Sequence, residues 1–312
     1  MTTTTGAPAL TVDGLHVAFR LPGATVQAVT DLSLTLHRGE LLAVVGESGC
    51  GKSVLAHAVL GLLPANATVT GAATLHPDVA LIGAGERRLR AVRGRRIGLI
   101  PQSPATALTP VRTGRSLLAE TLRAHGRPTS DADRIAAEAG LDPGDLDRYP
   151  FQLSGGMAQR LATALALAPD PAVLLADEPT AGLDRPLVDH TLDLLRRRCD
   201  AGAAVLLITH DLTAAQRVAD SVAVMYASRI VEHRPAADLY TTPTHPYAAA
   251  LLNALPDHAF RPIPGHPPML TALPTGCAFA PRCPRADTAC TEQPALDAGA
   301  ACHHPLSPAG AT

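Results

Sequence analysis

Apolar and polar residues alternate along the first forty positions of the chain. Short alternating runs occupy residues 10–12, 15–19, 26–29 and 32–36. A period of two is typical of strands with one buried face. The pattern therefore predicts a small antiparallel sheet near the N-terminus, and further strands are expected at 69–75 and 97–100.

Three other apolar runs are continuous rather than alternating: 41–45, 173–175 and 205–208. Continuous runs indicate strands that are buried on both faces, as in parallel sheets covered by helices. Residues 115–168 are rich in Ala, Leu, Arg and Glu at helical spacing. The predicted class is α/β, with a parallel-sheet core, an antiparallel β subdomain and an α-helical subdomain at about 103–165.

The composition changes to Pro, His, Thr and Cys from about residue 235. We therefore predict one domain at 9–237 and a small cysteine-containing extension at 238–312. The uncharged stretch 239–256 contains three prolines and a histidine, so it is not expected to span a membrane.

Bulk properties argue against nucleic acid as a partner. The chain has 312 residues, a net charge of −2, only 3% aromatic residues and no Trp. An arginine cluster at 87–96 is therefore interpreted as a solvated connector, because base-stacking aromatic residues are absent beside it.

The chain contains 26 Lys and Arg residues, and Lys52 is the only lysine. It stands in Gly46–Ser53, which has the spacing G-x-x-x-x-G-K-[ST] of a phosphate loop. The run 41–45 predicts a strand before the loop, and 54–63 predicts a helix after it. Backbone N–H groups of residues 49–53 would surround phosphates. The predicted nucleotide-binding residues here are Gly46, Ser48, Gly49, Cys50, Gly51, Lys52 and Ser53.

Two acids, Asp177 and Glu178, follow the apolar run 173–175. A carboxylate at the carboxyl end of a parallel strand faces the ligand crevice. Phosphoryl transfer needs one group for Mg²⁺ and one for the attacking water. Lys52 would reach the β- and γ-phosphates, Ser53 and Asp177 would hold Mg²⁺, and Glu178 would orient and polarise the water.

The segment Ser154-Gly155-Gly156 opens a predicted helix and offers a second anion site through its hydroxyl and backbone donors. Combined with the motifs above, it makes residues 9–235 resemble the ATP-binding cassette (ABC) ATPases, which have a RecA-like core. The resemblance implies that Ser154, Gly155 and Gly156 bind the γ-phosphate of ATP held by an opposite subunit.

The same resemblance implies roles for three more residues. Gln102 would contact Mg²⁺ and the attacking water and couple the site to a membrane partner. His210 would contact the γ-phosphate and hold Glu178 in position, and Asp184 would cross a dimer interface. Pro101 and Met157 differ from the residues that are commoner in the family, and Phe19 is the only candidate to stack on adenine.

The C-terminal third resembles the ATPases of oligopeptide, dipeptide and nickel importers. The matching segments there are Thr244–Tyr247, Ala250–Leu252, Ile263–Gly265, Leu273–Cys277 and Pro281–Pro284, and Tyr149–Met157 fits the same group. This resemblance implies a heterodimer with a second ABC ATPase subunit, two transmembrane permeases and an extracytoplasmic substrate-binding protein. It places the chain peripherally at the cytoplasmic face of the membrane, with ATP and Mg²⁺ as cofactors.

The same sequence also distinguishes between alternative functions. Peptide import is favoured, with import of nickel or another metal chelate as the alternative. A DNA-repair ATPase would need a long coiled-coil insertion, but only about fifty residues separate Gln102 from Ser154. A translation-factor ATPase would need two cassettes in one chain, and no internal repeat is present.

Four cysteines in the extension, at 277, 283, 290 and 302, have the spacing C-x5-C-x6-C-x11-C. In a reducing cytosol such a set argues for metal rather than disulfides. Zn²⁺, a [4Fe–4S] cluster and free thiols all stay open, and the lack of C-x2-C pairs favours the cluster. The family resemblance favours the cluster too, since some members carry one here. His303 and His304 are spare ligands.

Overall fold

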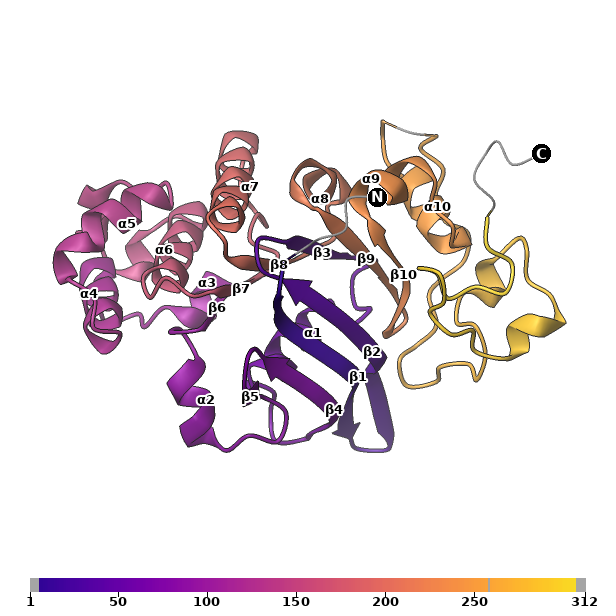
Figure 1. Ribbon diagram of the computed structural model, residues 1–312. Helices are drawn as coiled ribbons and strands as arrows, with labels where there is room; N and C mark the ends of the chain where they lie inside the picture. Colours follow the sequence, from indigo (N-terminus) through magenta and orange to yellow (C-terminus); the bar gives the residue numbers. More distant parts are fainter. Residues whose placement is uncertain (1–5, 258, 307–312) are drawn as a thin grey trace. The chain divides into compact units, whose positions relative to one another are not determined.

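The structure, a computed structural model, describes residues 6–257 and 259–306 (Figure 1). Residues 307–312 of the predicted extension lie outside the described residues. The chain forms two compact units. Unit 1 combines the described residues up to Ala9 with Leu36–Leu41 and Ala84–Ile208, and unit 2 combines Leu10–Thr35, Leu42–Gly83 and the residues from Thr209 onward.

Unit 1 contains a parallel sheet of three strands. These are β6 (Ile97–Ile100), β7 (Val173–Asp177) and β8 (Ala204–Thr209). Strand β7 pairs in parallel with both neighbours, with Val173 opposite Ile97 on one side and Ala204 on the other. Every residue of β7 and β8 is buried. The continuous apolar runs therefore mark central parallel strands, as predicted.

The helices of unit 1 include a compact helical group. They are α2 (Glu86–Val92), α3 (Pro104–Ala107), α4 (Gly114–Ala124), α5 (Ala132–Glu138), α6 (Gly155–Leu167) and α7 (Arg185–Asp200). One buried apolar cluster joins α4, α5 and α6, which lie together in magenta in Figure 1. Leu118, Ile135 and Leu161 are among its buried members. Within the arginine cluster, α2 is a helix whose Glu86 pairs with Arg90 and Arg93.

Unit 2 contains a four-stranded sheet with the order β2-β1-β4-β5. The strands are β1 (Pro8–Leu21), β2 (Ala24–His37), β4 (Ala67–Leu75) and β5 (Val79–Ala80), and the β1–β4 and β4–β5 pairs are antiparallel. Each predicted pair of short strands is one long strand here. The interruptions at Gly14 (φ +52°) and Asp31 (φ +51°) are left-handed residues inside a strand rather than turns.

A second group of strands in unit 2 carries the phosphate loop. Strand β3 (Leu41–Val45) pairs in parallel with β9 (Ser221–Tyr226), which pairs antiparallel with β10 (Arg229–Pro235). Helix α1 (Lys52–Val59) follows the loop. It is shorter than the predicted 54–63, because Gly61 takes a left-handed φ of +63° and Pro64 follows.

The rest of unit 2 is helical and then irregular. Its helices are α8 (Leu212–Val218), α9 (Ala236–Thr241) and α10 (Pro246–Asn253). After α10, the described chain has only two short 3₁₀ turns, Ala280–Arg282 and Thr288–Thr291. No helix in the described part of the chain combines the length and apolar character needed to cross a bilayer.

Candidate functional site

The phosphate loop closes around the ammonium group of Lys52. Its Nζ donates to the carbonyl oxygens of Gly46 at 2.7 Å and Glu47 at 3.0 Å, and lies 3.8 Å from the Cys50 sulfur. Lys52 is buried, whereas Ser48 and Gly49 at the tip of the loop are exposed. Ser53 occupies the second position of α1. The strand, loop and helix are thus in the order that the motif requires.

Two loop glycines have no room for a side chain. Gly46 has a φ of +153°, and a Cβ there would collide with the Met225 carbonyl oxygen. Gly51 has a φ of +109°, and a Cβ there would collide with the Ala28 carbonyl oxygen. Only glycine reaches this geometry without strain, so neighbouring backbone fixes the path of the loop.

Glu47 is held by residues that sequence reasoning did not assign to the loop. Its backbone N–H donates to the Tyr247 hydroxyl at 3.1 Å. Its carboxylate accepts two hydrogen bonds from the Arg282 guanidinium, at 3.0 and 3.3 Å. Tyr247 and Arg282 lie within the family motifs quoted above, but no local pattern connects them with a loop some two hundred positions earlier.

The carboxyl ends of β6 and β7 bring three predicted residues of unit 1 to one sheet edge. Asp177 ends β7 and is 1% exposed, and Glu178 follows at 7% exposed. Gln102 lies two residues after β6, which pairs with β7 up to Ile100 and Ala176. Glu178 has a left-handed φ of +46°, and its N–H donates to the Ile208 carbonyl at 2.8 Å. Strained backbone of this kind clusters at functional sites.

The Ser-Gly-Gly segment also lies in unit 1. Ser154 is the N-cap of α6, where its hydroxyl accepts from the Met157 N–H at 3.3 Å. Gly155 has open space around it, and a Cβ on Gly156 would lie 3.3 Å from Leu183 in the loop that ends at Asp184. Asp184 is the N-cap residue of α7.

Helix α6 contacts the segment that carries Gln102, because the Gln159 amide donates to the Pro101 carbonyl at 3.1 Å. His210 is exposed and follows β8 directly. Phe19, the candidate adenine-stacking residue, is half-buried in β1 opposite Ala67.

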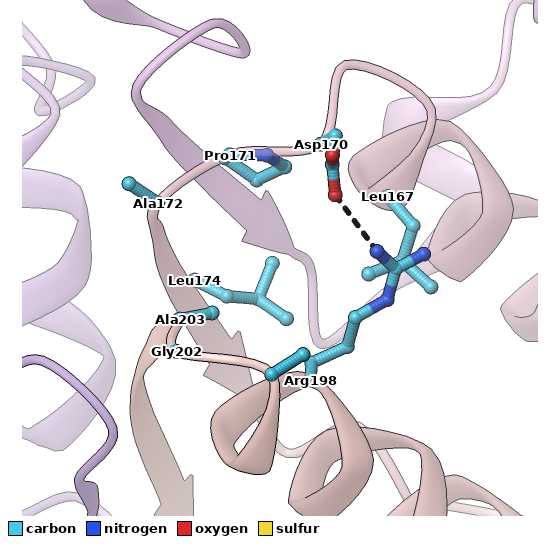
Figure 2. A pocket seen from close by; sticks show the side chains of 9 residues that line it. Leu167, Asp170, Pro171, Ala172, Leu174, Arg198, Gly202 and Ala203 are labelled. Carbon is cyan, nitrogen blue, oxygen red and sulfur yellow. Dashed lines mark hydrogen bonds and ion pairs between the residues drawn. The ribbon is translucent and has the colours of Figure 1, made fainter.

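A cavity of about 210 Å³ in unit 1 lies at the opposite end of the strands (Figure 2). It is lined by Ala172 just before β7, by Leu174 in β7 and by Ala203 just before β8. The Arg198 guanidinium reaches Asp170 beside it at 2.8 Å. The predicted carboxylates Asp177 and Glu178 lie at the other end of β7, so this cavity is separate from the predicted site.

All four predicted cysteine ligands of unit 2 line one pocket, together with His245, His303 and His304. Backbone N–H groups point at the sulfurs two residues earlier in the chain. The Arg285 N–H donates to Cys283 and the His304 N–H to Cys302, each at 3.4 Å. Burial raises the pKa of the Cys277 and Cys302 thiols, whereas donors aimed at sulfur favour the thiolate.

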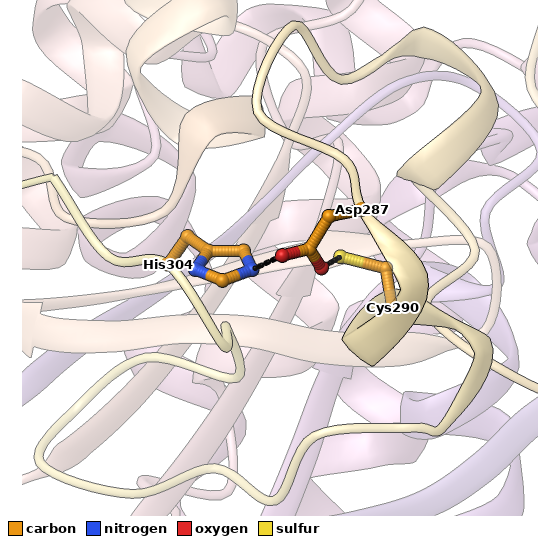
Figure 3. A group of neighbouring side chains, drawn as sticks. All are labelled: Asp287, Cys290 and His304. Atoms are coloured by element: carbon orange, nitrogen blue, oxygen red, sulfur yellow. Dashed lines mark hydrogen bonds and ion pairs between the residues drawn. The ribbon is translucent and has the colours of Figure 1, made fainter.

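Other polar side chains lie in or beside this pocket. Among the described residues, the only trio of ligand atoms within 4.8 Å of one another is Asp287, Cys290 and His304. Figure 3 shows His304 and Cys290 both directed at the Asp287 carboxylate, with the His304 contact at 2.8 Å. His245 is 1% exposed, and its Nδ1 accepts from the Tyr247 N–H at 3.0 Å. Its Nε2 makes no hydrogen bond of good geometry, although the Ala301 carbonyl lies near it.

Comparisons with known proteins agree along most of the chain. The model of the family described as "ABC transporter" matches residues 29–181, and that of "Oligopeptide/dipeptide transporter, C-terminal region" matches 231–290. The dipeptide transport ATP-binding protein DppD of Bacillus subtilis is 42% identical over 297 residues, covering 90% of this chain and 88% of the relative. The oligopeptide transport ATP-binding protein OppD of Salmonella typhimurium is 39% identical over 303 residues, covering 93% and 90%.

Solved structures confirm the predicted fold class. A structure described as the ATP binding subunit of an ABC transporter is 26% identical with a TM-score of 0.62, covering 74% of this chain and 91% of that one. A bacterial ABC transporter cassette solved as a dimer has a TM-score of 0.67 at 24% identity, covering 73% and 98%, and supports the fold alone. The chain therefore belongs to the oligopeptide/dipeptide family of ABC transporters, as an ATP-binding subunit that hydrolyses ATP.

Proposed function

We propose that this ATPase powers the import of dipeptides or oligopeptides from a peripheral position at the cytoplasmic face of the membrane. The observation that carries the proposal is the phosphate loop, whose buried Lys52 and side-chain-excluding glycines are built for the phosphates of ATP. The names of the relatives DppD and OppD favour peptides over nickel as cargo. Mg²⁺ would supply charge neutralisation at the β- and γ-phosphates.

Each predicted residue has a proposed role in this function. Lys52 and the loop N–H groups bind phosphates, Ser53, Gln102 and Asp177 hold Mg²⁺, and Glu178 polarises the attacking water. The burial of Asp177 and the strained backbone of Glu178 support these roles. His210 contacts the γ-phosphate and positions Glu178.

The proposed active form pairs this chain with a second ABC ATPase subunit, two permeases and an extracytoplasmic binding protein. Ser154, Gly155 and Gly156 then bind the γ-phosphate of the partner's ATP, and Asp184 crosses between the subunits. The open space at Gly155 and the helix N-terminus at Ser154 suit an approaching phosphate.

The isolated chain should hydrolyse ATP slowly, and adding the second subunit and permeases should raise the rate. Full activity in a monomer, unchanged by protein concentration, would contradict this.

The central test is Glu178→Gln in the assembled transporter, with the partner's own site disabled. We expect ATP binding to be retained and phosphate release to fall at least about a hundredfold, because the water loses its base while the fold is kept. Asp189→Asn, on the nearby helix α7, is the matched control for loss of one carboxylate. Unchanged phosphate release in Glu178→Gln would overturn the assignment.

We also propose that the four cysteines hold a metal group with a structural role, because the residues present fit one. Four thiols line one pocket, two of them accept from backbone N–H groups, and the pocket is also lined by a buried imidazole, His245, whose Nε2 makes no hydrogen bond of good geometry. Four thiols suit either Zn²⁺ or a [4Fe–4S] cluster, and the lack of C-x2-C pairs in their spacing favours the cluster.

Anaerobic purification followed by iron, sulfide and zinc analysis tests this proposal. The expected result is about four irons and four sulfides per chain. One zinc per chain would replace the cluster by Zn²⁺. Neither metal, with four titratable thiols in the native protein, would end the proposal while leaving the ATPase function intact.

A further inference from the structure

Arg282 links the cysteine segment to the phosphate loop within unit 2. It ends the 3₁₀ turn Ala280–Arg282, which lies between two cysteines of the pocket, Cys277 and Cys283. Its side chain is only 5% exposed. A buried guanidinium must use its donors, because unsatisfied N–H groups away from water are costly.

All five N–H donors of this guanidinium have acceptors. Two go to the Glu47 carboxylate, at 3.0 and 3.3 Å, and one goes to the Tyr226 hydroxyl at 3.2 Å. The remaining two go to the carbonyls of Pro264 at 2.7 Å and Ile263 at 3.4 Å. These five bonds fix the planar guanidinium in one orientation. Both of its terminal nitrogens are directed at the Glu47 carboxylate of the phosphate loop.

An aromatic cluster fixes the position of this fork. The rings of Tyr226, Tyr247 and Phe279 pack together with centroids 4.4 to 5.4 Å apart, and all three are buried. The chain has only four Tyr, four Phe and no Trp, so these three are a large share of its aromatic residues. The Arg282 guanidinium carbon lies 5.7 Å from the Tyr226 ring centroid and 5.9 Å from that of Phe279, within cation–π range.

The other end of the contact is a residue whose backbone belongs to the loop itself. The Glu47 carbonyl accepts from Lys52, its N–H donates to Tyr247, and its carboxylate is held by Arg282. These contacts together restrain the residue whose carbonyl Lys52 uses. Nucleotide affinity depends on such positioning, since the loop N–H groups bind phosphate only at the correct distance and angle.

We propose that Arg282 is a positioning residue of the phosphate loop, which acts through Glu47 and makes ATP affinity depend on the C-terminal cysteine segment. The inference rests on the proposed binding of ATP by this loop. It requires no metal in the cysteine pocket, because the contacts of Arg282 are all made by protein atoms.

The test is a double-mutant cycle on the full chain with Arg282→Gln, Glu47→Gln and the double variant. The readout is the dissociation constant for Mg–ATP, measured by calorimetry. We expect Arg282→Gln to weaken binding at least about tenfold, or about 1.4 kcal/mol. The double variant should be no weaker than Arg282→Gln alone, because both changes break one contact. Arg282→Lys should restore part of the affinity, since it keeps the charge and loses the fork.

Two controls keep the outcomes separable. Arg285→Gln removes an exposed arginine side chain of the same segment that is not among the groups bonded to Glu47, and it should bind Mg–ATP as the wild type does. Glu47→Gln leaves the C-terminal segment unaltered, so it reports on the contact even where Arg282→Gln fails to fold. Wild-type affinity in Arg282→Gln, or additive losses in the double variant, would overturn the inference. A wild-type chain that does not bind Mg–ATP would instead overturn the proposed function.

Discussion

The phosphate loop binds with its backbone, whereas the cysteine pocket would bind with its side chains. The loop motif is eight consecutive residues that follow strand β3 and include the first two residues of helix α1, and its shape is set by glycines that exclude a Cβ. The pocket draws its four thiols from residues 277–302, where the described chain has only two 3₁₀ turns. A backbone site is therefore specified locally, while a side-chain site depends on how a long irregular segment folds.

The largest effect should come from adding one methyl group to the backbone site. In Gly51→Ala, the new Cβ would overlap the Ala28 carbonyl and lie 2.9 Å from the Met225 methyl, so the loop must move. We expect Mg–ATP affinity to fall at least about a hundredfold, in line with the cost of forcing atoms into packed structure.

Gly49→Ala is the matched control for this change. Gly49 also has a positive φ, +80°, but no atom lies within 4 Å of its added Cβ. Its cost should be limited to backbone strain of about 1–2 kcal/mol, or about tenfold in affinity. Equal losses of Mg–ATP affinity in the two variants would show that backbone strain alone, and not the overlap of residue 51 with Ala28, weakens binding.

The contrast between the two sites also explains what the sequence could predict. The phosphate loop, the strand ending at Asp177 and the cap at Ser154 were readable because each depends on neighbours within a few residues. The pairing of β9 with β10 was not predicted. The hydrogen bonds of Tyr247 and Arg282 to Glu47 were not predicted either. They depend on contacts between positions far apart in the chain, which no local pattern encodes.

The cysteine pocket could be predicted from the sequence only in part. Their spacing predicted a shared site, and the structure places all four around one pocket. The spacing could not predict that His245, more than thirty residues earlier, lies at the same pocket with a pKa lowered to about 4 by burial. A neutral buried imidazole there follows from the packing of α10 against the segment, not from the cysteine motif.

A smaller effect on nucleotide binding is expected when the side-chain site is broken. Cys302→Ser removes one thiol of the pocket and should abolish the metal content, while Mg–ATP affinity falls by no more than about threefold, or 0.7 kcal/mol. The reason is that Arg282 keeps all its protein acceptors. Cys199→Ala, a fully buried cysteine of α7 outside the pocket, is the control and should keep its metal.

The measurement is metal analysis and calorimetry on the same preparations. Unchanged metal in Cys302→Ser would remove this residue from the ligand set. A loss of affinity as large as that of Gly51→Ala would show that the two sites are not separately specified.

A modest effect should come from removing the single hydrogen bond that joins α10 to the loop. Tyr247→Phe keeps the ring in its aromatic cluster but removes the hydroxyl that accepts the Glu47 N–H at 3.1 Å. Leaving one backbone donor without its partner costs about 1 kcal/mol, so Mg–ATP should bind about fivefold more weakly. Tyr240→Phe is the control, since its hydroxyl donates to the Leu212 carbonyl at 2.7 Å and has no bond to the loop.

Because Arg282 makes two charged bonds to Glu47 and Tyr247 makes one neutral bond, Tyr247→Phe should cost less affinity than Arg282→Gln. The reverse order would mean that the backbone N–H of Glu47, rather than its carboxylate, is the point at which the C-terminal segment holds the phosphate loop.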